Sequence, residues 1–282
     1  MTNPRVDTTF STPDGRRLGY AEYGEADGKP VFLFHGNPGS RYEWLRVAGS
    51  ETLRGLRAIG PDRPGFGLSD FQPRRTHLDW AKDVAALADH LGLDKFAVIG
   101  FSAGGAHALA CAAAMPERVA RLGLISCVAP LDVPGITEGM SWPNKRELLL
   151  ARASFVLAWA WMVPMARRAL GQARRRLAKA PDGVDRDKQD AIYRNLEEAF
   201  RQGARGCAYE LTLRSRPWVF DVSQVSTETH LWQGEADDNV PPPMGHYLAK
   251  ALPKCEAHFV PGGRHALHGR RMDEILSAVM ER

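Results

Sequence analysis

The sequence predicts an α/β fold: a mostly parallel central sheet with helices on both faces, plus an inserted helical cap. Short apolar runs alternate with helical patterns from residue 30 to 130, and this alternation resumes at 230–281. Between them lie about ninety residues with helical patterns only. Alternating strands and helices require parallel strands joined by crossover connections. We therefore expect a core formed by 1–130 and 225–282, and a cap formed by 131–224.

Composition and charge exclude several classes of protein. The chain has 282 residues, of which 44% are hydrophobic and 25% charged, as in an ordinary globular protein. This excludes a disordered chain and a multi-span membrane protein. The net charge of +4 is too small to indicate nucleic-acid binding. Its distribution is uneven, since residues 131–224 hold 16 basic and 11 acidic residues, a net charge of +5, and the rest has −1.

The first elements are predicted from turn residues and apolar runs. Residues 8–24 indicate a hairpin, with Pro13, Asp14 and Gly15 in its turn. The run 30–36 is typical of a strand buried on both faces. Further on, patterns predict strands at 56–61, 95–100 and 121–130 and helices at 77–92 and 103–119.

The second half begins with the predicted cap. Two helices are expected there, at 144–179 and 185–214, split by a loop at 180–183. The uncharged run 153–166 is shorter than the roughly 20 residues that span a membrane, and Pro164 interrupts it. We expect a buried or pocket-lining helix without stable membrane insertion; a lid that touches lipid is the alternative. The core then resumes with strands at 230–237 and 255–260 and helices at 243–252 and 268–281.

Ser102 is the candidate nucleophile. It lies in Gly100-Phe101-Ser102-Ala103-Gly104, a G-x-S-x-G pattern between a predicted strand and a predicted helix. At such a strained turn, larger side chains two positions away from the serine would collide with neighbouring backbone. The helix N-terminus also favours developing negative charge.

A serine hydroxyl needs a base, and the base needs a carboxylate to orient it. His265 follows the last predicted strand in a loop rich in glycine, and His268 is its rival. Asp237 lies just past the preceding strand end, and Asp238 and Asp132 are the alternatives. Backbone N–H groups of Ala103 and Asn37 are the candidate oxyanion hole, because acyl transfer develops a negative oxygen.

Taken together, these motifs resemble the α/β-hydrolase superfamily. Their order along the chain is HGNPG, DRPGFGLSD, GFSAGG, GEADDNVP and GGRH, over about 60% of the sequence. HGNP is similar to haloalkane dehalogenases, and the capped architecture to epoxide hydrolases. Both use an aspartate nucleophile where this chain has Ser102, so we set those reactions aside. The glycine-rich turn 62–69 lacks a nucleotide-binding pattern, and the resemblance implies a structural role for it.

The cap is expected to determine the substrate. Phe101, Trp159 and Met162 are the candidate pocket residues, and Phe155, Trp161 and Met165 are further apolar candidates. For any single one of these cap residues, packing of the cap against the core is the preferred explanation. A basic cluster in the cap is expected to be solvated helix surface, with an anionic substrate or lipid as alternatives; it comprises Arg167, Arg168, Arg174, Arg175 and Arg176.

The sequence therefore predicts a serine hydrolase that cleaves a small carboxylic ester with an apolar part. Hydrolysis of a carbon–carbon bond, a thioester or an aminoacyl amide remains an alternative, as do a triad-retaining ligand receptor and a lipase acting at a membrane surface. No cofactor and no metal are implied, since the four cysteines are widely spaced and expected to be reduced. The N-terminus lacks an apolar signal core, so a cytoplasmic location is expected.

Overall fold

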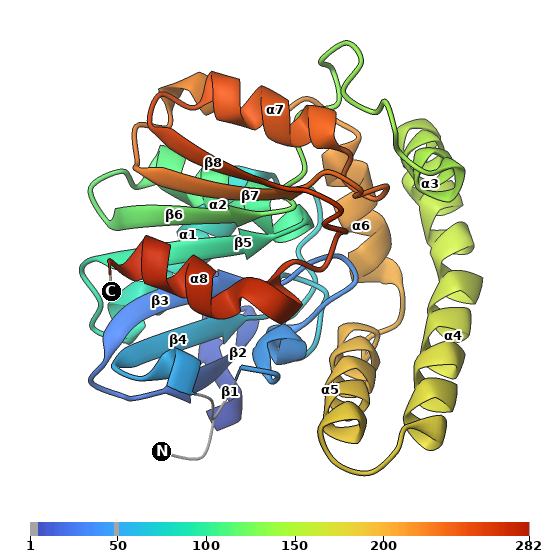
Figure 1. Cartoon of the computed structure of the whole chain (residues 1–282), viewed down its shortest axis with the longest axis horizontal. Helices are drawn as coiled ribbons and strands as arrows, with labels where there is room; N and C mark the ends of the chain where they lie inside the picture. Colours follow the sequence, from blue (N-terminus) through green and yellow to red (C-terminus); the bar gives the residue numbers. More distant parts are fainter. Residues whose placement is uncertain (1–4, 48–50, 282) are drawn as a thin grey trace.

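The core is an eight-stranded sheet with the strand order β1-β2-β4-β3-β5-β6-β7-β8 (Figure 1). The computed structural model describes residues 5–47 and 51–281. β2 runs antiparallel to β1 and β4, and every other neighbouring pair is parallel. The strands are β1 (Arg5–Ser11), β2 (Arg17–Gly24), β3 (Lys29–Phe34), β4 (Leu56–Pro61), β5 (Phe96–Phe101), β6 (Val119–Ile125), β7 (Thr229–Gly234) and β8 (Cys255–Val260).

Helices cover both faces of this sheet, because its central strands carry continuous apolar runs such as Val31–Phe34. On β3, Phe32 and Phe34 belong to the core that includes α1 (His77–His90), α2 (Ala103–Ala114) and α7 (Pro242–Ala251). The alternate residues Val31 and Leu33 belong to the core that includes α8 (His268–Met280). Neighbouring side chains on a strand point to opposite faces, so one continuous apolar run builds both layers. The predicted fold class is confirmed.

Four helices lie between β6 and β7, where two were expected. They are α3 (Trp142–Ala153), α4 (Phe155–Lys179), α5 (Val184–Ala199) and α6 (Arg205–Arg214). The first expected helix is divided at Ser154, whose backbone is extended and whose side chain accepts a hydrogen bond from the Val156 N–H as an N-cap. The second is divided before α6, where Gly203 has a φ of 81°. Figure 1 shows these helices together at one end of the core.

α4 continues through Pro164, which was expected to interrupt the apolar run. The helix is held by packing, since Ala158, Met162 and Ala166 are buried in a cluster with residues of α6. Tertiary contacts thus outweigh the hydrogen bond that a proline removes. Within the described residues, no helix is both long enough and apolar enough to cross a membrane.

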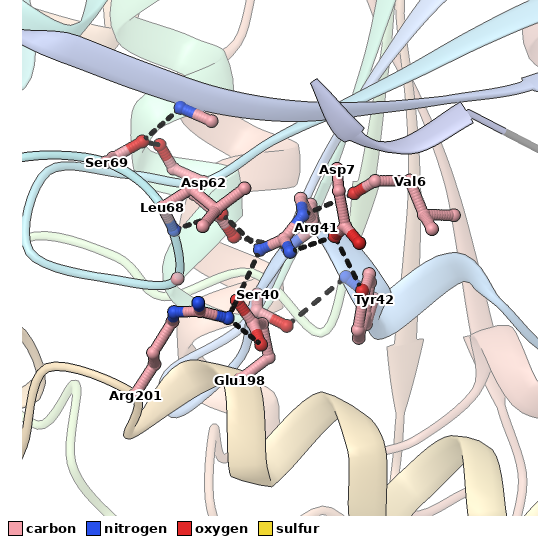
Figure 2. A network of polar contacts seen from close by, with 12 residues as sticks. Val6, Asp7, Ser40, Arg41, Tyr42, Asp62, Leu68, Ser69, Glu198 and Arg201 are labelled. Atoms are coloured by element: carbon pink, nitrogen blue, oxygen red, sulfur yellow. Dashed lines mark hydrogen bonds and ion pairs between the residues drawn. The ribbon is translucent and has the colours of Figure 1, made fainter. Parts of the chain in front are cut away.

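Arg41 fastens the helical segment to the core. It lies in η1 (Arg41–Trp44), and its guanidinium is fully buried. One terminal nitrogen lies 2.8 Å from Asp62, which directly follows β4 in the chain, and 2.8 Å from Glu198 of α5. The other lies 2.6 Å from Asp7 of β1 (Figure 2). One cation therefore joins three carboxylates from distant parts of the sequence.

Candidate active site

Ser102 occupies a strained turn between β5 and α2. Its φ of 55° and ψ of −119° lie in a region that residues with a side chain rarely adopt. A Cβ atom on Gly100 would lie 2.5 Å from the carbonyl oxygen of Gly104. A Cβ atom on Gly104 would lie 2.5 Å from the carbonyl oxygen of Phe34. The two glycines therefore allow the helix to start close to the sheet, and the serine stands at its N-terminus.

Ser102, His265 and Asp237 form a chain of two short contacts. His265 Nε2 lies 3.0 Å from Ser102 Oγ, and its Nδ1 lies 2.8 Å from Asp237 Oδ2. The other oxygen of the buried Asp237 accepts hydrogen bonds from the N–H groups of Asn239 and Val240 at 2.9 and 3.0 Å. The carboxylate is therefore fixed in position, and its free edge faces the imidazole.

Sheet register explains how these residues meet. β7 and β8 are parallel, with Gly234 opposite Val260, so the loops after them leave the same edge of the sheet. Asp237 lies in the first loop and His265 in the second. The strained turn after β5, which carries Ser102, lies at this same edge, since the carboxyl ends of parallel strands lie together.

The rival residues lie elsewhere. His268 packs against Phe101 at 4.2 Å between ring centroids, and its Nε2 lies 3.4 Å from Glu43. Asp238 accepts hydrogen bonds through its backbone carbonyl from Ser141 and Asn144. Asp132 borders a separate cavity that does not include Ser102.

The loop after β3 is held from both sides. Arg63 is buried and donates hydrogen bonds to the carbonyl oxygens of His35 and Gly36, the latter at 2.9 Å. The side-chain oxygen of Asn37 accepts a hydrogen bond from the thiol of Cys207 in α6 at 2.9 Å. These contacts fix the position of the Asn37 backbone beside the serine.

Two backbone donors remain unused at this place. Within the described residues, neither the Asn37 N–H nor the Ala103 N–H donates a hydrogen bond to the protein. Ala103 begins α2, where the first N–H groups of a helix lack partners in the helix itself. Both residues are therefore able to donate to a group bound next to Ser102.

Arg63, which holds the loop after β3, belongs to a buried ionic cluster. Glu210 of α6 lies 3.2 Å from Arg63 Nε, 2.5 Å from Arg75 and 3.5 Å from His107. Burial by itself would raise the pKa of Glu210, but Arg63, His107 and Arg75 outweigh it and hold the pKa far below its usual value. Glu210 is therefore ionised, and it forms ion pairs with two guanidinium groups. Sequence patterns did not reveal this cluster, because its members are spread over four segments.

A cavity of about 760 Å³ opens over the serine, between the core and the helical segment. Two of the candidate pocket residues, Phe101 and Met162, line it. Trp159, the third candidate pocket residue, is not among the lining residues; its side chain is 42% exposed and stacks on Phe155. The helix α4 borders the cavity with one of its faces. Trp161 lies on that face, whereas Trp159 does not. Further apolar lining comes from Met165, Leu196, Phe200 and Leu211.

Polar residues also line this cavity, and most of them were not among the residues that the sequence singled out. They include Asn144, Arg146, Glu147, Arg168, Gln172 and Arg214. Of the predicted basic cluster, only Arg168 borders the cavity. The site is therefore mixed in character, with charged groups beside methionine and aromatic side chains.

One group of side chains has the composition of a metal site, at a different place. His230, Glu256 and His258 lie on β7 and β8, with their potential ligand atoms within 4.8 Å of one another. His230 stands near the amino end of β7, whereas Asp237 follows its carboxyl end. These residues are therefore not part of the Ser102 site. The four cysteines are all free thiols, and three of them are buried.

Comparisons with known proteins agree with this architecture. The model of the alpha/beta hydrolase fold family matches residues 29–269. A non-heme chloroperoxidase of Streptomyces lividans is 41% identical over 133 residues, which cover 46% of this chain and 48% of that protein. The chain thus spans about half the length of the first curated relatives it matches.

Solved structures that resemble the whole chain include two esterases. The esterase RhEst1 of a Rhodococcus species has a TM-score of 0.72 and 21% identity, with 98% of each chain covered. An esterase of Thermogutta terrifontis has a TM-score of 0.67 and 24% identity, covering 99% of this chain and 97% of that one. At identities of 21% and 24%, this likeness shows a shared fold alone. With the family model spanning most of the sequence, the chain belongs to the alpha/beta-hydrolase family of enzymes.

Proposed function

We propose that this enzyme is a serine hydrolase that cleaves a carboxylic ester through an acyl-enzyme. The observation that carries the proposal is the chain Ser102–His265–Asp237, with contacts of 3.0 and 2.8 Å. His265 is within reach of the serine proton, and Asp237 orients the ring. Asp237 also stabilises the imidazolium that forms when His265 takes the proton.

The reaction proceeds in two halves. Ser102 Oγ attacks the ester carbonyl while its proton moves to His265 Nε2. The resulting oxyanion accepts hydrogen bonds from the N–H groups of Asn37 and Ala103, which have no partner within the described residues. His265 then gives the proton to the leaving alcohol, and an acyl-Ser102 ester remains. Water, deprotonated by His265, attacks that ester, releases the acid and restores the serine.

The helices α3–α6 are proposed to act as the cap that selects the substrate. They contribute most of the side chains around the cavity, including Met162, Met165 and Leu211. Because these are apolar and flexible or branched, they suit an apolar part of a small ester. The same chain of residues is chemically competent for thioesters, amides and carbon–carbon bonds, so the ester assignment depends on this cavity.

A fluorophosphonate probe tests the nucleophile. The probe is expected to label the wild-type protein covalently at one residue and not to label Ser102→Ala. Because the probe needs an activated serine and no particular acyl group, it separates the mechanism from the choice of substrate. A wild-type protein that remains unlabelled contradicts the serine mechanism.

The base is tested by a matched pair of histidine variants. His265→Ala is expected to lose probe labelling and ester turnover, because no other imidazole contacts Ser102 within the described residues. His268→Ala keeps the 3.0 Å contact between His265 and Ser102 and is expected to retain most turnover. The reverse pattern contradicts the assignment of His265.

A further inference from the structure

Arg214 is a charged group that the proposed mechanism leaves without a task. It stands at the end of α6 and lines the same cavity as Ser102. Its Nε atom is buried and has no hydrogen-bond partner, and within the described residues its guanidinium forms no ion pair within 4.0 Å. The residue as a whole is half-buried, and it is one of the residues that line the cavity.

Three other guanidiniums, all buried in the described part of the chain, are paired. Arg41 lies 2.8 Å from Asp62, Arg63 lies 3.2 Å from Glu210, and Arg75 lies 2.5 Å from Glu210. Removing a cation from water without a partner costs several kcal/mol, so buried arginines are normally matched by an anion. Arg214 departs from this pattern, and it borders the cavity.

The surroundings do not supply the missing anion at contact distance. Burial lowers the pKa of Arg214, and the carboxylates of Glu147 and Glu210 oppose this from beyond ion-pair distance. Glu210 is already engaged by Arg63 and Arg75. Glu147 lines the cavity too, accepts a hydrogen bond from Trp161 at 3.4 Å, and has a pKa raised by burial. Arg214 therefore keeps its donors available for a bound group.

Arg214 lines the same cavity as Ser102 and Asn37. The thiol of Cys127, which follows β6, and the thiol of Cys207, which contacts Asn37, both raise the pKa of Arg214. The residue next to Cys127, Val128, donates a backbone hydrogen bond to the Ser102 carbonyl at 3.3 Å. Arg214 is therefore less exposed than Arg146 and Arg168, which line the same cavity.

We propose that Arg214 binds a carboxylate of the substrate, so that the preferred substrates are esters carrying a carboxylate on the acyl or the alcohol side. This inference rests on the proposed ester hydrolysis and adds the charge of the substrate. A guanidinium offers a planar fork of N–H donors that matches a carboxylate in a bidentate pair. Glu147, on the same cavity, weakens that binding by repulsion. Arg214 is accordingly a specificity-determining residue, and the bond cleavage remains with Ser102 and His265.

Two pairs of esters of matched shape test this inference. On the acyl side, 4-nitrophenyl hydrogen glutarate is compared with its methyl ester. On the alcohol side, 4-acetoxybenzoate is compared with methyl 4-acetoxybenzoate. In at least one pair, the wild-type enzyme is expected to have the higher kcat/KM for the carboxylate. Arg214→Met is expected to lower that value about 10- to 100-fold, as loss of a charged hydrogen-bonded pair does, with the neutral ester changed less than about threefold.

Further variants separate this effect from damage to the fold. Arg214→Lys keeps a charge without the fork and is expected to restore part of the preference. Arg146→Met and Arg168→Met remove exposed charges from the same cavity. Each is expected to change the preference for the carboxylate ester less than about threefold. Glu147→Gln removes the repulsion and is expected to strengthen the preference for the carboxylate.

The outcomes are distinguishable from failure of the proposed function. A wild type that prefers the neutral ester in both pairs overturns the inference while ester hydrolysis stands. An Arg214→Met variant that loses both esters of a pair equally also overturns it. If Glu147→Gln loses the carboxylate preference, Arg214 and Glu147 act as a structural pair, and the inference is overturned. Absence of probe labelling at Ser102 would instead refute the hydrolase mechanism itself.

Discussion

His265 Nδ1 lies 2.8 Å from Asp237 Oδ2, although 28 residues separate them. Asp237 Oδ1 is held by two backbone N–H groups, so the carboxylate cannot turn away from the ring without losing both. The imidazole therefore presents Nε2 to Ser102. In the proposed mechanism, the aspartate acts through the orientation and tautomer of the histidine.

Asp237→Asn is expected to lower kcat for ester hydrolysis by about 10⁴-fold, because the amide supports the wrong tautomer of His265. Initial-rate assays with an activated ester would measure this loss. Asp238→Asn is the control, since the described contacts of Asp238 run through its backbone carbonyl. Equal losses in the two variants would contradict the assignment of Asp237.

Gly104→Ala is expected to reduce both stability and turnover. The new Cβ would lie 2.5 Å from the Phe34 carbonyl and 2.6 Å from that of His35, so α2 must move away from the loop that carries Asn37. We expect a loss of about 1–3 kcal/mol in the free energy of unfolding. Urea denaturation and initial rates would measure the two effects.

Gly171→Ala is the control for that substitution. Gly171 is inside α4, and among the described residues no atom outside the helix lies within 4 Å of the position that a Cβ would occupy there. Alanine there is expected to raise stability by up to about 1 kcal/mol through higher helix propensity. If both alanine variants behave alike, close packing at Gly104 is not the cause of its effect.

Arg41→Met is expected to lower the free energy of unfolding by about 3–5 kcal/mol, since it leaves the fully buried Asp62 without its cation. Thermal and chemical unfolding would measure the change. Arg201→Met removes a neighbouring guanidinium that also contacts Glu198 but is 56% exposed, and it should cost under about 1 kcal/mol. A similar cost for both would show that burial of Arg41 is unimportant.

Acid is expected to destabilise the fold through its buried histidines. Burial lowers the pKa of His77 from 6.5 to about 4. Between these values the unfolded chain binds a proton that the folded chain does not, so the free energy of unfolding falls as the pH falls through this window. The slope from His77 alone is up to about 1.4 kcal/mol per pH unit.

His77→Phe removes this contribution while keeping an aromatic ring beside Trp218 and Phe220. Its unfolding free energy is therefore expected to depend less on pH between 6.5 and about 4 than that of the wild type. Urea unfolding at several pH values in this window measures the difference. Parallel curves for the two proteins would mean that His77 does not titrate as its burial implies.

The sequence by itself determined the fold class and most core elements, because continuous apolar runs and turn residues act locally. The strand predicted at 56–61 is β4, and the strand predicted at 255–260 is β8. The sequence also placed Ser102, Asp237 and His265 just after predicted strands, and the structure brings them together because parallel strands end at one edge of the sheet.

Only the tertiary structure decided the rest. The division of residues 131–224 into four α-helices depends on the helix N-cap at Ser154 and on contacts with the core, which outweigh the helical pattern. The choice between His265 and His268 depends on which side chain reaches Ser102, and a spacing of three residues cannot decide this. Arg214 stands out only because its guanidinium has no ion-pair partner within the described residues. Whether a charge is paired depends on distances between segments far apart in the sequence, so residue order does not reveal it.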